Sequence, residues 1–210
     1  MARSSNTDPV RNFKFQVQIV PNGKLGTSVD TSIGNLGFAV VSGLSVQNEM
    51  IAYREGGMNT HPHKMIGQSD FGPVTFSKGV FGHERALHQW QSYLHQWSQG
   101  GTDSAKATGS TSGNNDYRAD IIVSVYDHPV SVGPYATPGE TEKAPTPAGQ
   151  AKLAFKLFNC WPGSYSLTDL NAGDSSIMIQ QMVINHEGFH IEWAPDKDSG
   201  VDLTALGGVC

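Results

Sequence analysis

The stretch MVINHEGFHIEW, residues 182–193, decides the fold of the C-terminal part of this chain. His186 and His190 stand four residues apart and Glu187 follows the first, which is the spacing of the zinc-protease signature H-E-x-x-H. That signature binds Zn²⁺ only on an α-helix, where residues four apart share one face. On a β-strand that rises about 3.3 Å per residue, the two imidazoles would lie roughly 13 Å apart. The local conformation therefore decides between a metal site and a sheet.

The residues around the two histidines favour the strand. Gly188 stands where a metalloprotease helix needs a good helix former. The β-branched and aromatic residues in and just before the stretch are Ile177, Ile179, Val183, Ile184, Phe189, Ile191 and Trp193. We therefore predict a last long strand over 182–193, with no metal and no cofactor. A zinc-dependent hydrolase that uses this motif remains the enzymatic alternative.

The composition indicates one soluble, β-rich domain that spans residues 1–210. The chain has 24 Gly and 11 Pro, and only 16% of its residues are charged. No apolar run approaches the roughly 20 residues that a membrane-spanning helix needs, so we expect no membrane insertion. The first residues, MARSSNTDPVRNF, lack the apolar segment of a secretory signal. We expect synthesis and retention in a cytoplasm until release by other means.

The charge and the cysteines exclude several functional classes. The formal net charge is −5, from 14 Lys+Arg against 19 Asp+Glu, which argues against tight binding of a phosphate backbone. The two cysteines are too few for a metal ribbon or a disulfide framework. We expect Cys160 to be buried and Cys210 to lie in a polar tail over 194–210. A bridge between the two is the alternative, which a reducing cytoplasm disfavours.

The sequence contains no recognisable catalytic motif. It has no G-x-S-x-G, no C-x-x-C, no phosphate loop and no Rossmann glycine fingerprint. Glu49, Glu55 and Glu187 are isolated carboxylates, which we interpret as surface or interface charges. His61 and His63 flank a proline, and we interpret them as loop histidines. Nothing therefore favours catalysis outside the zinc motif.

Alternating apolar residues predict several further strands. They cover 12–20, 36–46, 73–80, 117–127 and a segment that starts at 151 and is closed by Trp161 and Pro162. The side chains expected on the apolar faces are Phe13, Phe15, Val17 and Ile19; Val74, Phe76 and Val80; Ile121, Val123 and Val125; and Leu153, Phe155 and Leu157.

One segment, GHERALHQWQSYLHQWSQG, predicts a helix. Its apolar stripe consists of Leu87, Trp90, Leu94 and Trp97, at helical spacing, and the pair Gly100 and Gly101 supplies the stop. His83, His88 and His95 are interpreted as its solvated flank.

Residues 47–64 predict a long hairpin. The run Glu55, Gly56, Gly57 and Met58 lies at or near its turn, because paired glycines supply the positive φ of tight turns. Its two faces are poorly separated into apolar and polar. A hairpin of this kind does not settle on its own core, so we expect it to pair with a neighbouring subunit.

Several segments occur in an order that carries a family likeness. They are DPVRNFKFQVQI, FAVVSGLSVQNEMIAYREGG, GPVTFSKGV, the tryptophan-containing helix and MVINHEGF. Together they resemble the tail-tube protein family of bacteriophages and related contractile injection systems. The resemblance implies an antiparallel β-sandwich or incomplete barrel with one flanking helix, closing into a hexameric ring with a continuous inner β-barrel. Such rings stack into a hollow tube, without catalysis.

The resemblance also implies an interface. The hairpin over 46–64 would contact neighbouring subunits and rings. The implied interface residues are Val46, Glu49, Tyr53, Arg54, Glu55, Gly56, Gly57, Glu187, Gly188 and Phe189. The chain departs from the short family pattern at two loop insertions, 102–116 and 128–150, which we expect outside the tube.

These implications lead to a structural function. We expect a tube subunit that conducts DNA or effector cargo and binds copies of itself, the tail sheath, the baseplate or initiator, the tape-measure protein and the terminator. Its place would be a virion tail or an extracellular injection particle, assembled in the cytoplasm of the host bacterium. A mildly acidic lumen would let cargo pass without sticking. A tube-capping or initiator ring of the same fold remains the structural alternative.

Overall fold

The computed structural model describes most of the chain, with several gaps. The described residues are 10–21, 25, 35–57, 60–82, 84–98, 117–126, 151–173, 175–195, 200–203 and 205–206. The predicted insertions 102–116 and 128–150 therefore lie outside them, as do His83, Gly100, Gly101 and Cys210.

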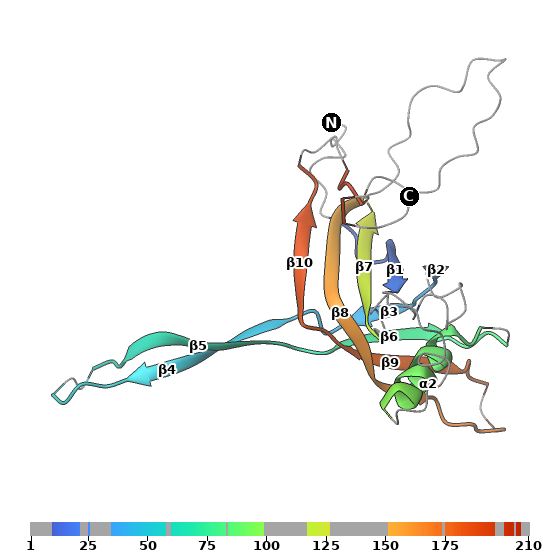
Figure 1. The fold of residues 1–210 in the computed structure, drawn as a ribbon, viewed down its shortest axis with the longest axis horizontal. Helices are drawn as coiled ribbons and strands as arrows, with labels where there is room; N and C mark the ends of the chain where they lie inside the picture. The colour runs from blue at the N-terminus through green and yellow to red at the C-terminus, as the bar shows by residue number, and fades with distance from the viewer. Residues whose placement is uncertain are drawn as a thin grey trace, which may run out of the picture.

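The predicted mainly β, antiparallel fold with one helix is confirmed, and most of its strands form a single bent sheet (Figure 1). The strand order is β2-β1-β7-β8-β9-β6-β3, and β10 pairs with the other side of β8. The bounds are β1 Phe15–Pro21, β2 Asn35–Leu36, β3 Val40–Ser42, β6 Val74–Gly79, β7 Ala119–Tyr126, β8 Ala151–Leu167, β9 Ile179–Asn185 and β10 Gly188–Trp193. All the pairings are antiparallel.

Strand β8 makes the bend, because its two halves belong to different parts of the sheet (Figure 1). Its first half pairs with β7 and β10, and its second half pairs with β9. The prediction that Trp161 and Pro162 close this strand is wrong, since pairing continues to Leu167. The register shifts between Pro162 and Ser164, and a bulge tolerates a proline that has no N–H to donate.

Helix α2, Ala86–Ser98, lies against the bend and contributes to the core (Figure 1). The predicted stripe is confirmed for Leu87 and Trp90, which are buried, while Leu94 is half-buried. The indole N–H of Trp90 donates to the carbonyl oxygen of Tyr117 at 3.0 Å. His88 and His95 are exposed, as expected of a solvated flank. The side chain of Trp97 lies outside the described part of the chain.

Two predicted apolar faces need correction. Phe13 precedes β1 and is 62% exposed, so the apolar face of that strand begins at Phe15. In β7 the residues on both faces are buried, since Ile122 and Ser124 are as inaccessible as Ile121 and Val123. A strand covered on both faces shows no alternation of burial, and its sequence pattern cannot reveal which face meets which layer.

The C-terminal segment is also more than a polar tail. Val201 and Leu206 are buried in a second cluster with Ile122, Ala151 and Ala154. The Val201 N–H donates to the Ala151 carbonyl oxygen at 2.7 Å. The segment therefore covers one side of β7 and β8.

Two long predicted strands are each broken. The prediction over 36–46 becomes β2 and β3, which pair with β1 and β6 respectively, and a second break follows β3 at Gly43. The prediction over 182–193 becomes β9 and β10, separated by a corner at His186 and Glu187. The parts β2 and β3 pair with different strands, and β9 and β10 pair with different halves of the bent strand β8, which one straight strand cannot do.

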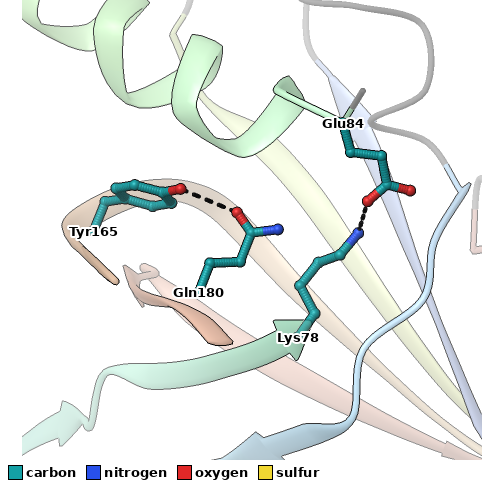
Figure 2. Close-up of polar contacts among 4 residues, drawn as sticks. All are labelled: Lys78, Glu84, Tyr165 and Gln180. Atoms are coloured by element: carbon teal, nitrogen blue, oxygen red, sulfur yellow. Dashed lines mark hydrogen bonds and ion pairs between the residues drawn. The ribbon is translucent and has the colours of Figure 1, made fainter. Parts of the chain in front are cut away.

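A group of polar side chains, two of them buried, comes from β6, β8, β9 and the segment before α2 (Figure 2). The predicted face of β6 carries Lys78 as well as Val74 and Phe76, and the Lys78 side chain is only 2% exposed. Its ammonium group pairs with the Glu84 carboxylate just before α2. Beside it, the Tyr165 hydroxyl donates to the Gln180 side chain at 3.0 Å. Burial raises the pKa of Tyr165, which keeps this hydroxyl protonated.

Within the described residues, no helix is both long and apolar enough to cross a membrane.

Candidate subunit interface

The predicted hairpin is confirmed and is longer than expected. Strands β4, Val46–Tyr53, and β5, His63–Phe71, form a separate two-stranded sheet. It projects away from the body as a long arm (Figure 1). His63 begins β5 and is therefore a strand residue, contrary to the prediction of a loop histidine. Every residue of β4 is exposed, so the arm has no core of its own.

The arm carries apolar side chains on both faces. Met50 pairs with Ile66, and the next position, Ile51, pairs with Met65. Paired residues share a face and successive residues alternate, so the two pairs lie on opposite faces. Ile66 is 83% exposed, and the other three are at least half exposed. A two-stranded sheet with exposed apolar pairs on both faces is stable only when a partner covers them.

The register of the arm contains a bulge at Glu49. Pairing shifts between Asn48 and Met50, where β5 has one residue more than β4. A Cβ added to Gly67 would lie 3.0 Å from the Glu49 carbonyl oxygen, so a glycine fits best at this position. The carboxylate of Glu49 lies on an exposed residue, consistent with the predicted surface or interface charge.

The tip of the arm holds four of the predicted interface residues. Arg54, Glu55, Gly56 and Gly57 follow β4 directly and are all exposed. Gly57 has a φ of 96°, which a glycine adopts without strain. The predicted glycine turn therefore lies at the end of the arm.

Val46, Glu49 and Tyr53 lie on β4, and the last three predicted residues lie at the base of the arm, at and just after the corner between β9 and β10. Glu187 forms an ion pair with Arg118 at 3.0 Å and accepts a hydrogen bond from Asn159 at 2.5 Å. Gly188 is buried in β10. The Phe189 ring packs edge-on against Phe71, with centroids 5.7 Å apart. Phe71, the last residue of β5, thus connects the arm to the corner residue group Glu187 to Phe189. Glu187 remains half exposed.

The H-E-x-x-H spelling does not form a helical zinc site. His186 lies in the corner and His190 lies on β10, so the face shared by residues four apart on a helix does not exist here. The His186 Nε2 lies 3.0 Å from the Gly72 carbonyl oxygen, whereas His190 is exposed. Among the described residues, no group of three or more His, Cys, Asp or Glu side chains could hold a metal ion.

Cys160 is buried, as predicted, and its chemistry is suppressed. Burial and the nearby Asp120 carboxylate raise the pKa of its thiol to about 12. The thiolate form is therefore scarce at neutral pH.

The sequence reasoning missed four exposed apolar residues of the arm, Met50, Ile51, Met65 and Ile66. Adjacent apolar residues in each strand were the available signal, because adjacent positions point to opposite faces. Only the pairing showed that both faces are apolar.

Comparison with known proteins identifies relatives of this fold. The family described as T4-like virus tail tube protein gp19 matches residues 11–190. The chain is similar to a component of the sheath-tube complex of an extracellular contractile injection system (PVC) in its extended state, with 18% identity and a TM-score of 0.61 over 90% of this chain and 95% of that one. The comparison with curated protein sequences gives no match.

Two further structures come from the anti-feeding prophage (AFP). A chain of the structure of its tube terminating cap has 20% identity and a TM-score of 0.59, over 92% of this chain and 95% of that one. A chain of its baseplate has 16% identity and a TM-score of 0.60, over 89% of this chain and 97% of that one. At these identities the likeness shows a shared fold. Because the family match covers well over half of the 210 residues, the chain belongs to the T4-like virus tail tube protein gp19 family, a family of structural tail tube proteins and not of enzymes.

Proposed function

We propose that this chain is the tube subunit itself. Copies close into hexameric rings with a continuous inner β-barrel, and the rings stack into a hollow tube that conducts DNA or effector cargo. The observation that carries the proposal is the projecting arm with Met50 and Ile66 on one face and Ile51 and Met65 on the other. In a tube, neighbouring copies supply the cover that the isolated subunit lacks.

The remaining predicted interface residues fit the same proposal. Val46 and Tyr53 are exposed apolar residues on the arm, and the tip residues reach farthest from the body (Figure 1). A heterologous contact that is repeated from subunit to subunit forms a closed ring when the rotations between subunits add up to a full turn. We expect the corner residues Glu187 to Phe189 to support the base of that contact.

The relatives support a set of partners. One belongs to a sheath-tube complex, one to a baseplate and one to the structure of a tube terminating cap. We propose that this chain contacts a sheath, a baseplate or initiator, a tape-measure protein and a terminator in its own particle. The net charge of −5 would help an anionic or acidic cargo to pass a lumen that does not bind it.

Electron microscopy of the purified chain tests the proposal. The unchanged protein should form long hollow tubes, and Ile66→Glu should abolish them while the subunit stays folded. The substitution places a charge at an 83% exposed position, so it destabilises the contact between subunits and not the monomer. The matched control is Gln68→Glu, which adds the same charge at an exposed polar position of the same strand. Tubes of normal length from Ile66→Glu would contradict the proposal.

The second candidate is a cap or initiator ring of the same fold. It is favoured by the similarity to the AFP tube terminating cap, whose TM-score of 0.59 is close to the 0.61 of the sheath-tube component. Polymerisation distinguishes the two functions. A tube subunit elongates as concentration rises, whereas a cap stops at single rings.

A further inference from the structure

The arm leaves the body through an interrupted ladder, which we call the elbow and define as residues 43–45 and 71–73. Strands β3 and β6 pair as far as Ser42 and Thr75, and β4 and β5 resume pairing at Val46 and Phe71. The arm is thus a continuation of the β3–β6 ladder beyond a break. The direction of the arm is set within this break.

The backbone of the elbow is tightly constrained. Gly43 has a φ of 97°, and a Cβ added there would lie 2.5 Å from the Pro73 carbonyl oxygen. Pro73 has no N–H and cannot extend the ladder. The Gly72 N–H donates to the Ser45 carbonyl oxygen at 3.2 Å, which holds the two connections together. These features break the ladder but keep its two sides paired.

The corner between β9 and β10, which is part of the body, contacts the elbow. The rings of Phe71, His186 and Phe189 form a mutual cluster, with centroids between 5.7 and 6.0 Å apart. His186 also contacts the Gly72 carbonyl oxygen through Nε2 at 3.0 Å. A carbonyl only accepts, so Nε2 carries the proton and donates. The His186 Nδ1 is buried and has no hydrogen-bond partner among the described residues.

We propose that His186 and Phe189 are positioning residues that fix the direction of the arm before assembly. This inference rests on the proposed function, in which the arm docks on neighbouring copies. If the arm samples many directions, only the fraction of molecules with a correctly directed arm can dock on a neighbouring copy. The apparent affinity for that copy falls in proportion to this fraction. The ring contacts hold the Phe71 side chain, and the His186 N–H holds the backbone next to it. The two residues together reduce the range of directions that the arm samples.

The direction of the arm is measured in the monomer by pulsed electron spin resonance. Spin labels go on Glu55→Cys at the tip and Gln181→Cys on β9, both exposed positions, in a Cys210→Ser and Ile66→Glu background that prevents tube growth. The buried Cys160 should stay unlabelled. We expect one narrow distance distribution for this parent and clearly broader distributions for His186→Ala and for Phe189→Ala.

Tube growth supplies the second readout, without labels and with Ile66 intact. The critical concentration should rise about three- to tenfold for His186→Ala, the effect of losing one hydrogen bond and part of a ring cluster. His186→Gln keeps an N–H donor and should recover part of the tube growth that His186→Ala loses. His186→Phe keeps a ring but loses the donor. His190→Ala is the matched control, because this histidine is exposed on β10.

Unchanged distance distributions in both His186→Ala and Phe189→Ala would overturn the inference. If the alanine variants do not fold, His186→Gln and His186→Phe take their place. Distance distributions of both variants that equal that of the parent would also overturn the inference. The spin-label result does not depend on assembly. Absence of tubes from the unchanged chain would therefore defeat the proposed function, while the distance distributions would still decide whether the corner directs the arm.

Discussion

At the scale of single residues, Lys78 is the clearest case of a charge that the fold places in its interior. Its ammonium group lies 5.9 Å from the Phe38 ring centroid and 5.7 Å from that of Phe81, and it pairs with Glu84 (Figure 2). A buried ammonium is tolerated only with a partner, because it has given up its hydration. The pair also ties the segment before α2 to β6.

Removal of the carboxylate should therefore cost more than removal of the ammonium. We expect Glu84→Gln to lower the free energy of unfolding by about 2–3 kcal/mol, since it leaves the Lys78 charge without its counter-ion; the value lies below the full range for buried pairs because Glu84 is 25% exposed. Lys78→Met should cost less, because methionine fits among the aromatic rings and Glu84 can turn to water. Urea denaturation measures both. A larger loss for Lys78→Met would refute the argument.

At the scale of elements, the breaks determine the shape. The predicted strands over 36–46 and 182–193 both continue their apolar patterns across a break, at Gly43 and at the corner of His186 and Glu187. The first break lies in the elbow, where the arm departs, and the second contacts the elbow through His186. Local propensity favours extension on either side, and the turn between them is set by which neighbour each half pairs with.

Gly43 offers a direct test of the elbow backbone. Gly43→Ala should lower the free energy of unfolding by about 1–3 kcal/mol, because alanine is strained at a φ of 97° and its Cβ would meet the Pro73 carbonyl oxygen at 2.5 Å. Gly37→Ala is the matched control, since a Cβ there meets nothing within 4 Å and no positive φ is required. Thermal and urea unfolding of the two variants compare them. Equal stabilities would show that the elbow accommodates a side chain.

At the scale of the whole molecule, the chain ends by completing a core that its earlier strands began. Val201 and Leu206 close the second cluster over β7 and β8. The Lys156 ammonium donates to the Leu206 carbonyl oxygen at 2.8 Å, which adds a polar attachment. The C-terminal segment thus stabilises the body, while strand β4 of the arm remains exposed.

Two leucines test this division of the molecule. Leu206→Ala should lower the free energy of unfolding by about 2–3 kcal/mol, because the side chain is 9% exposed and its removal leaves a cavity beside Ala154. Leu170→Ala should change it by less than about 0.5 kcal/mol in the monomer, since that side chain is 85% exposed. Urea denaturation below the assembly concentration gives both values. Similar losses would mean that the C-terminal segment contributes no core packing.

The sequence by itself determined the local features of this protein. Alternation predicts strands near β1 and β6, helical spacing places Leu87 and Trp90 on one buried face, and the paired glycines lie at the tip of the arm. The order of the motifs indicates the tail-tube family. These features depend on contacts within a few residues or on the order of short motifs, so a single sequence is enough to predict them.

Only the tertiary structure decided the features that depend on distant partners. Pairing with β9 carries β8 through Pro162, and pairing of β9 and β10 with different halves of β8 creates the corner at His186. The same holds for the burial of Lys78 and for the exposure of both faces of the arm. A residue's own pattern states that it is apolar or charged, but which segment covers it is a property of long-range strand pairing, and a single bulge is enough to change the face that it presents.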